Sequence, residues 1–425
     1  MSKVRLGAPA PSTRRVLLAS LVGTAVEFYD FYVYATAAAL VLGPLFFPKG
    51  DANAQLLSSY ATFALAFIAR PVGGWVFGHF GDRIGRKSTL VASLLLMGGS
   101  TVAIGLLPTY AMVGGWAPLL LCILRFGQGF GLGGEWGGAA LLAVENAPPS
   151  HKARFGMFPQ LGAPVGFLAA NGLFLLLTLV ITKEQFKDWG WRLPFMASAV
   201  LVGVGLWVRL KLTETPAFAE AMKAGPPLRA PLAELLKHHW LRVLAGVFAT
   251  VSVFAVYYVI TAFALGYGTG ALHYSYAAFL SVQLGAIGFF AIGVILSACW
   301  ADMLNARKVL IAACVITVPM SFLLAPMMQS GSVLILWAFL SIAMFVMGVT
   351  YGPLGAFLPS LFPARVRYTG ASMAFNLAGV IGGGLTPFIA QSLVRSGGLR
   401  YVGYYIAAAG LISLLALMPI WTVED

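Results

Sequence analysis

Apolar residues occur along the chain in long stretches that short polar segments separate, and these segments carry most of the charges. A helix that crosses a bilayer needs about 20 mostly apolar residues, and we find twelve such stretches. Their approximate limits are 16–44, 56–80, 88–107, 116–145, 155–182, 190–210, 240–266, 275–300, 309–328, 332–360, 370–394 and 402–421. The pattern therefore predicts an all-α membrane protein with twelve transmembrane helices.

Most of the 27 Lys and Arg residues lie in alternate connections, beginning with the segment before the first span. Cytoplasmic loops are enriched in Lys and Arg. We therefore expect these connections and both termini to face the cytoplasm. Arg70 and Arg125 are exceptions, because they fall within predicted spans.

Trp189 and Trp191, at the start of span six, are expected to be anchors at the membrane interface. The many glycines of span four, between Gly127 and Gly138, are expected to pack closely against neighbouring helices.

The long connection over 211–239 follows the sixth span and is rich in proline. It is expected to be a cytoplasmic linker between an N-terminal six-helix half, 1–210, and a C-terminal six-helix half, 240–425. Two pairs of segments are alike in the two halves, namely 138–139 with 355–356 and 153–156 with 366–370. The halves are thus predicted to be pseudo-repeats, an arrangement found in parallel-repeat transporters.

Composition excludes several classes of protein. Hydrophobic residues make up 60% of the chain and charged residues only 10%, whereas soluble domains carry roughly a quarter charged residues. A cytosolic enzyme, a secreted disulfide scaffold and a disordered interaction protein are all excluded. The net charge of +13 comes without a basic stripe of interleaved aromatics, so nucleic acid is not an expected partner. The three cysteines show no metal-ligand or disulfide spacing, and no metal or cofactor is expected.

The loop between the second and third spans reads GHFGDRIGRK over residues 78–87. A basic loop after any span would explain its cations but neither Asp82 nor the glycines. The loop resembles the G-x-x-x-D-R-x-G-R-K signature of the major facilitator superfamily at every fixed position. The resemblance implies a gating role for Gly78, Asp82, Arg83, Gly85 and Arg86.

Asp82 is expected near the positive N-terminal end of span eleven, where its charge is favourable. That contact would hold the cytoplasmic side shut in one state. The counterpart loop after span eight, 302–308, keeps an acid and two bases but lacks the glycines. It supports the repeat only weakly.

Further motifs narrow the resemblance: EFYDF at 27–31, RFGQG at 125–129, GGEWGG at 133–138, WGWRLPF at 189–195, ETPAF at 214–218 and LFPARVRYTG at 361–370. Over nearly the whole chain the sequence resembles the metabolite:proton symporter family. Members carry α-ketoglutarate, citrate, shikimate, other carboxylates, or proline and betaine, and the resemblance does not choose among these substrates. It implies a monomeric carrier in the bacterial plasma (inner) membrane, with a central cavity lined mainly by spans one, four, seven and ten.

Five ionisable residues lie inside predicted spans, namely Glu27, Asp30, Arg70, Arg125 and Glu135. A charge at the centre of a span costs roughly 2.5–3.5 kcal/mol on insertion scales. A water-filled central cavity would explain why all five are present. The alternative is that the acids and arginines only neutralise one another within a packed bundle.

Helical spacing groups these residues with polar neighbours. Glu27, Asp30 and Tyr34 share one face of span one. Arg125, Gln128 and Glu135 fall on one side of span four. Arg125 and its neighbours Gln128 and Tyr34 are therefore candidates for contact with a substrate.

Arg125, with Arg70 as second candidate, is predicted to bind a substrate carboxylate through charge-assisted hydrogen bonds. All five histidines lie in loops or at span ends, so a carboxylate must carry the proton. Asp30 and Glu135 are predicted carriers, and Glu27 is a further candidate. An acid that releases its proton when Arg125 is free, and regains it when substrate occupies Arg125, would couple the two fluxes.

The second half supplies only neutral polar groups to its spans. The candidate hydrogen-bonding groups for substrate are Tyr257, Tyr258, Gln283, Tyr351 and Asn376, although ordinary helix packing explains each of them equally well. If they line the site, the first half handles charge and the second half shapes selectivity.

The sequence thus predicts a proton-coupled symporter that imports a small organic metabolite, a carboxylate anion, by alternating access. An uncoupled facilitator or exchanger and an osmolyte symporter for proline or betaine remain alternatives. A transporter-like sensor would be expected to carry a signalling domain, and the predicted termini are short. An intramembrane enzyme would need a nucleophile–base pair or metal ligands at depth, and neither is visible, so the chain is not expected to be an enzyme.

Overall fold

The computed structural model describes residues 13–84, 86–210, 231–363 and 366–419, with the side chains of 13–16, 78–90, 208–210 and 231 left aside. Helices and short connections make up this described part, and no strand occurs in it. Its first elements are α1 (Thr13–Ala37), η1 (Ala38–Leu42), α2 (Gly43–Phe46), α3 (Ala52–Ile84), α4 (Arg86–Leu106), α5 (Tyr110–Val113), α6 (Trp116–Leu132), α7 (Glu135–Glu145), η2 (Pro149–His151), α8 (Lys152–Val180), α9 (Lys183–Gln185), η3 (Phe186–Gly190) and α10 (Arg192–Leu210).

The remaining elements are α12 (Pro231–His238), α13 (Trp240–Tyr258), η4 (Val259–Phe263), α14 (Ala264–Gly270), α15 (Tyr276–Leu304), α16 (Ala306–Ser321), α17 (Leu324–Met328), α18 (Val333–Tyr351), α19 (Leu354–Ser360), α20 (Arg367–Gly379), η5 (Val380–Gly384), α21 (Thr386–Gly397) and α22 (Leu399–Leu417). The segments η1, η3, η4 and η5 are single turns of π-helix. Such turns are rare in helices and are often found at functional sites.

Each of the twelve predicted spans coincides with a helix or a run of consecutive helices. Within the described residues, nine are long and apolar enough to cross a membrane, or ten if the pair Lys183–Gly190 and Arg192–Trp207, bent by 48°, is one span. Of the other two, Val91–Leu106 is a shorter apolar helix, and α16 is separated by a break from α17. The predicted all-α, twelve-helix membrane fold is confirmed.

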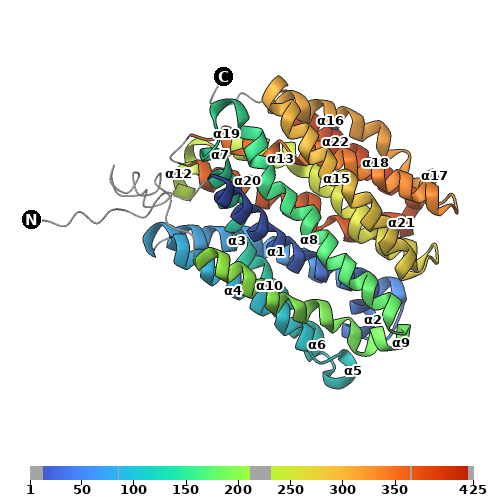
Figure 1. Ribbon diagram of the computed structural model, residues 1–425. Coiled ribbons are helices and arrows are strands. Elements are labelled where there is room, and N and C mark those ends of the chain that lie inside the picture. Colours follow the sequence, from blue (N-terminus) through green and yellow to red (C-terminus); the bar gives the residue numbers. More distant parts are fainter. Residues whose placement is uncertain (1–12, 85, 211–230, 364–365, 420–425) are drawn as a thin grey trace, which may run out of the picture.

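The helices pack in two groups that meet along α8 and α3. In Figure 1, α1 and α8 cross the middle of the bundle, with α4, α6 and α10 on one side and α15, α16, α18 and α22 on the other. The closest contacts between the groups join α8 to α15 and α19, and α3 to α20 and η5. The division at a linker stays a prediction, since residues 211–230 lie outside the described part and α12 forms a helix within the predicted linker.

The glycines of span four permit a close approach of α6 to α3. A Cβ atom on Gly129 would lie 2.0 Å from the carbonyl oxygen of Ala66, and one on Gly133 would lie 2.0 Å from that of Arg70. Small residues allow transmembrane helix backbones to meet in this way. The predicted packing role of these glycines is confirmed.

Spans four and ten are broken, and each break accepts a hydrogen bond from the other group. The first break separates α6 from α7 at 133–134, and the Asn376 side-chain amide donates to the Gly133 carbonyl at 2.8 Å. The second separates α18 from α19 at 352–353, and the Gln160 amide donates to the Tyr351 carbonyl at 3.0 Å. The side-chain amides of Asn376 and Gln160 thus join the two groups of helices, because each donates to a carbonyl that a helix break leaves free.

One expectation about the membrane interface was wrong. Trp189 and Trp191 resemble interface anchors because they begin span six, and Trp189 is indeed exposed. Trp191 is fully buried instead and packs against Phe46 and Phe195, with ring centroids 5.7 and 5.8 Å away. Trp191 therefore belongs to the core, at the 48° bend between Lys183–Gly190 and Arg192–Trp207.

Candidate functional site

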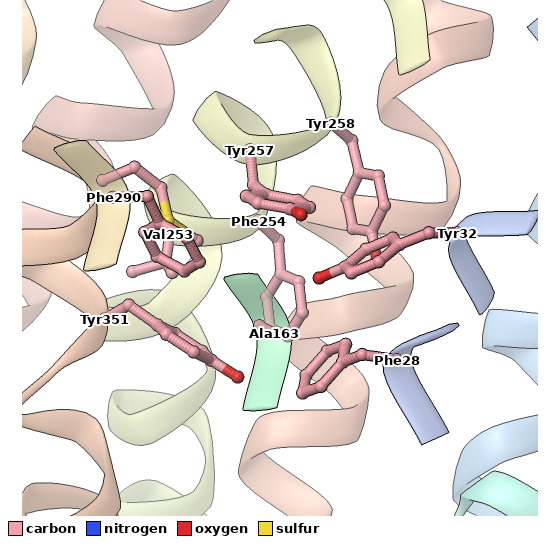
Figure 2. Close-up of a pocket in the computed structure, with 10 residues that line it drawn as sticks. Phe28, Tyr32, Ala163, Val253, Phe254, Tyr257, Tyr258, Phe290 and Tyr351 are labelled. Atoms are coloured by element: carbon pink, nitrogen blue, oxygen red, sulfur yellow. The ribbon is translucent and has the colours of Figure 1, made fainter. Parts of the chain in front are cut away.

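A small cavity lies at the centre of the bundle, between α1, α8, α13, α15 and α18. It has a volume of about 20 Å³, which is room for about one water molecule. Figure 2 shows its wall, which consists mainly of aromatic rings. The lining residues are Phe28, Tyr32, Ala163, Val253, Phe254, Tyr257, Tyr258, Phe290, Met347 and Tyr351. Of the predicted substrate ligands, Tyr257 and Tyr258 lie here.

Arg125 on α6 is fully buried beside α3, and neutral acceptors occupy its guanidinium group. Its Nη2 donates to the Phe63 carbonyl at 3.1 Å, and its Nε to the Thr62 carbonyl at 3.4 Å. Its Nη1 donates to the side-chain oxygen of Gln128. The guanidinium carbon lies 3.6 Å from the centre of the Tyr34 ring. The predicted neighbours Gln128 and Tyr34 do surround Arg125, and together they satisfy it.

Asp30 on α1 is fully buried next to this cluster. The hydroxyl of Ser198 on α10 donates to one carboxyl oxygen at 2.5 Å, and the other oxygen has no hydrogen-bond partner among the described residues. The Gln128 amide donates to the Asp30 backbone carbonyl at 3.0 Å and to the Thr101 hydroxyl at 2.8 Å. Arg125 is therefore linked to the Asp30 backbone through one side chain, and no cation forms an ion pair with Asp30 in the described part.

Arg70 on α3 and Glu27 on α1 occupy a second place, nearer the central cavity. Both are 3% exposed and lie within electrostatic reach of each other and of Tyr351. The guanidinium carbon of Arg70 lies 5.5 Å from the ring centre of Phe67 and 5.8 Å from those of Phe31 and Phe375. The structure thus places four of the five predicted charges in two clusters, Arg125 with Asp30 and Arg70 with Glu27.

Three further candidates lie at helix irregularities or bind to them. Glu135 is the first residue of α7, where an acid is favourable, and accepts a hydrogen bond from the Ser93 hydroxyl at 2.6 Å. The Gln283 amide donates to the Ile260 and Thr261 carbonyls of η4, both at 2.8 Å. Asn376 binds the break in span four, as described above. In this conformation these groups fasten helices, and their predicted roles toward substrate or protons stay untested.

The sequence also predicts a water-filled cavity lined by the five buried charges, and this conformation does not contain one at the described central cavity. None of the five is among its lining residues. Arg125 and Asp30 are sealed within the first group of helices, and rings surround Arg70. In this conformation the buried charges are thus enclosed by side chains and backbone of the described part.

The gating loop lies largely outside the described part of the chain. The α3 backbone continues to Ile84 and α4 begins at Arg86, but Gly85 and the side chains of Asp82, Arg83 and Arg86 are not described. The backbone of Gly78 lies within α3. The predicted contact of Asp82 with span eleven therefore stays a prediction.

The counterpart loop, which seemed weak from its sequence, contains a well-formed contact. Asp302 at the end of α15 accepts hydrogen bonds from the backbone amides of Ala153 (2.8 Å) and Arg154 (3.1 Å) at the start of α8. Arg154 Nε also lies 3.5 Å from an Asp302 carboxyl oxygen. An acid at a helix N-terminus is stabilised by the free amides and the helix dipole. The loop lacks the glycines of the 78–87 loop, so its sequence gives little indication of this contact. The one indication is the acid, Asp302, that it shares with that loop.

Replacing Asp302 with Ala should slow transport more than it weakens substrate binding. The carboxylate joins α15 to α8, so its loss destabilises the state in which this end is closed. Loss of charged hydrogen bonds worth about 1.5 kcal/mol would shift the equilibrium about tenfold. We expect the initial uptake rate to fall by about that factor and the binding affinity to change less than about threefold. Asp188→Ala, at an exposed acid of η3, is the control, and equal effects of the two substitutions would contradict the role.

Comparisons with known proteins agree with this architecture. The family model described as Major Facilitator Superfamily matches residues 20–387. The inner membrane metabolite transport protein YhjE of Escherichia coli (strain K12) is 50% identical over 416 residues, covering 96% of this chain and 94% of that protein. The shikimate transporter of the same strain is 37% identical over 410 residues, covering 95% and 94%.

The fold also resembles solved structures. The crystal structure of a D-xylose–proton symporter superposes with a TM-score of 0.73 at 18% sequence identity, covering 96% of this chain and 97% of that one. At this identity the likeness concerns the fold alone. The family model and the full-length relatives show that this chain belongs to the Major Facilitator Superfamily and is a multi-pass membrane transporter of metabolites, not an enzyme.

Proposed function

We propose that the protein is a proton-coupled symporter that imports a small organic carboxylate by alternating access. It acts in the bacterial inner membrane as a monomer, with both termini in the cytoplasm and two six-helix halves joined by the linker. The end that holds α7, α19 and the Asp302 contact is then the cytoplasmic end.

Asp30 is the observation that carries the proposal. It is a fully buried carboxyl group with one neutral donor, Ser198, and no ion pair in the described part of the chain. An isolated charge is expensive in such a place, which gives a reason for a proton to occupy it during part of the cycle. Its position one side chain away from Arg125 supports a link between proton movement and rearrangement of α6.

The substrate class is supported by charge and by a relative. Two buried arginines provide positive charge at the depth of the site, which favours an anion. The name of the 37% identical relative, a shikimate transporter, is that of a carboxylate carrier. A carboxylate that enters together with a proton also crosses the membrane with less uncompensated charge.

Extracellular pH tests the coupling directly. Cells or proteoliposomes that contain the protein are placed in unbuffered medium, and a carboxylate identified by thermal-shift screening is added. A symporter removes protons from the medium, so the external pH should rise as substrate enters. Uptake without any change of pH would contradict symport and favour the uncoupled facilitator or exchanger.

An osmolyte symporter is the second candidate, and the observation that favours it is the ring-lined cavity. Aromatic faces attract alkylated ammonium groups, and seven of the lining residues are Phe or Tyr. Membrane potential separates the two candidates, because a zwitterion that enters with a proton carries net charge, whereas a monoanion that enters with one proton does not. An inside-negative potential should accelerate uptake of glycine betaine and leave one-to-one uptake of a monocarboxylate nearly unchanged.

A further inference from the structure

The two buried arginines differ in one respect that the sequence does not reveal. Arg125 is satisfied by two backbone carbonyls, one amide oxygen and a tyrosine face. Arg70 is equally buried, yet its Nε has no hydrogen-bond partner among the described residues, and no described residue forms an ion pair with it. Each nitrogen of the Arg125 guanidinium group thus donates a hydrogen bond, whereas the guanidinium group of Arg70 has an Nε donor that no described residue uses.

Aromatic faces replace acceptors around Arg70. The rings of Phe31, Phe67 and Phe375 all have their centres within 5.8 Å of its guanidinium carbon. Such contacts attract a cation, but they leave the Nε–H donor without the acceptor that a buried arginine normally requires. An anion that reached this place would supply that acceptor in the paired geometry that guanidinium favours.

A single layer of rings separates Arg70 from the central cavity. Phe31 packs against Tyr258, with centroids 6.4 Å apart, and Phe375 packs against Phe254 at 4.9 Å. Tyr258 and Phe254 both line the cavity. Movement of these rings would therefore join Arg70 to the cavity. Arg125 shares Phe31 with Arg70, at 5.2 Å, but its donors are already bound to the Thr62 and Phe63 carbonyls and to Gln128.

The cavity contains unused hydrogen-bonding groups of its own. The hydroxyls of Tyr257 and Tyr351 are buried, and neither makes a hydrogen bond of good geometry within the described part. The Tyr32 hydroxyl lies beside the first and the Trp136 side chain beside the second. Figure 2 shows both hydroxyls directed into the space between the rings, from α13 and α18. Phenolic hydroxyls both donate and accept, so they can bind hydroxyl or carbonyl groups of a ligand.

We propose that Arg70, not Arg125, binds the substrate carboxylate, and that the adjoining cavity, once the rings of its wall have moved apart, holds a ring-shaped or similarly bulky body whose polar groups meet Tyr257 and Tyr351. This assignment rests on the proposed function and narrows it. One guanidinium group with a free Nε donor matches one carboxylate. A second carboxylate would face aromatic rings and the acid Glu27, so a cyclic monocarboxylate fits better than a di- or tricarboxylate. Arg125 is then a positioning residue that holds α1, α3 and α6 together.

Binding to purified, detergent-solubilised protein tests this assignment. The probes are shikimate, benzoate, succinate, citrate and glycine betaine, and dissociation constants are measured by isothermal titration calorimetry. We expect wild type to bind shikimate or benzoate more tightly than succinate or citrate. Arg70→Gln should weaken that binding about 10- to 100-fold, as expected for loss of a charged hydrogen-bonding partner. Arg70→Lys should restore part of it, because lysine keeps the charge without the paired geometry.

Matched variants separate binding from folding. Arg125→Lys should lower the thermal stability and the maximal uptake rate, while the dissociation constant and the KM change less than about threefold. Tyr351→Phe and Tyr257→Phe keep the rings, so they should weaken shikimate, which carries hydroxyls, more than benzoate, which does not. Gel filtration identifies the variants that remain folded.

The outcomes are distinct. Unchanged affinity in a folded Arg70→Gln protein, or a large loss confined to Arg125→Lys, would overturn the role of Arg70. Tightest binding of citrate or succinate, or of none of the five probes, would overturn the substrate class. Binding that depends on Arg70 but moves no protons during uptake would leave this assignment standing and contradict only symport.

Discussion

Asp30→Asn should abolish uphill accumulation of substrate while leaving exchange of internal for external substrate intact. Asparagine has nearly the shape of the acid and can still accept the 2.5 Å hydrogen bond from Ser198, but it cannot release a proton. A pH difference of one unit corresponds to about 1.4 kcal/mol, or about tenfold accumulation for one proton per substrate. The variant should therefore fall from about tenfold accumulation to none.

Proteoliposomes with an imposed pH gradient measure both reactions with the same radiolabelled substrate. Asp51→Asn is the matched control, because Asp51 is exposed and accepts hydrogen bonds only from the nearby backbone amides of Asn53 and Ala54. It should accumulate substrate as wild type does. Loss of both accumulation and exchange, or of neither, would count against Asp30 as the proton carrier.

Gly129→Ala should have the second large effect, on folding and thereby on transport. The added Cβ would lie 2.0 Å from the Ala66 carbonyl oxygen, and a backbone atom cannot yield as a flexible side chain can. Helices α3 and α6 would have to separate, at a cost of about 3 kcal/mol if the site behaves like other overpacked cores. Because α3 also carries Arg70, four residues from Ala66 along one helix face, uptake should be lost as well.

Gly172→Ala on α8 is the control for this substitution. A Cβ at Gly172 meets no atom within 4 Å, so the same chemical change adds no clash. The thermal midpoint of the purified protein and the yield of monodisperse protein measure the difference. Similar values for the two variants would show that α3 and α6 tolerate a wider separation than their contact suggests.

Hydropathy alone predicts the helices, because lipid requires long apolar stretches whose backbone groups bond internally. It does not predict where those helices break. Gly133 and Gly134 resemble ordinary packing residues in the sequence, and Gly133 does pack against α3. The carbonyls at the break accept hydrogen bonds from Asn376 and, at 2.5 Å, from the Tyr368 hydroxyl. Only the arrangement in space reveals those partners.

The sequence predicts which charged residues are buried at the candidate site, but not which hydrogen-bond partners they have. Buried charge in a membrane marks a functional region, and the five residues chosen on that basis are all buried. The sequence favours Arg125 over Arg70 as the ligand of the substrate carboxylate. In the structure, however, the Arg125 guanidinium group already donates hydrogen bonds to the Thr62 and Phe63 carbonyls. Backbone acceptors are present in every residue, so no sequence pattern shows which arginine they will reach.

Spans four and ten are each interrupted, and the helix that follows each interruption is short. Segment α7 has 11 residues and α19 has 7, so each is a short helix, and α19 follows closely on Tyr351 of the cavity wall. A regular helix would use the Gly133 and Tyr351 carbonyls internally. A continuous helix in span four would thus leave no free carbonyl for Asn376, and a continuous helix in span ten would leave none for Gln160. The interruption of each span and its hydrogen bond to the other group of helices therefore depend on the same backbone carbonyl, that of Gly133 or of Tyr351.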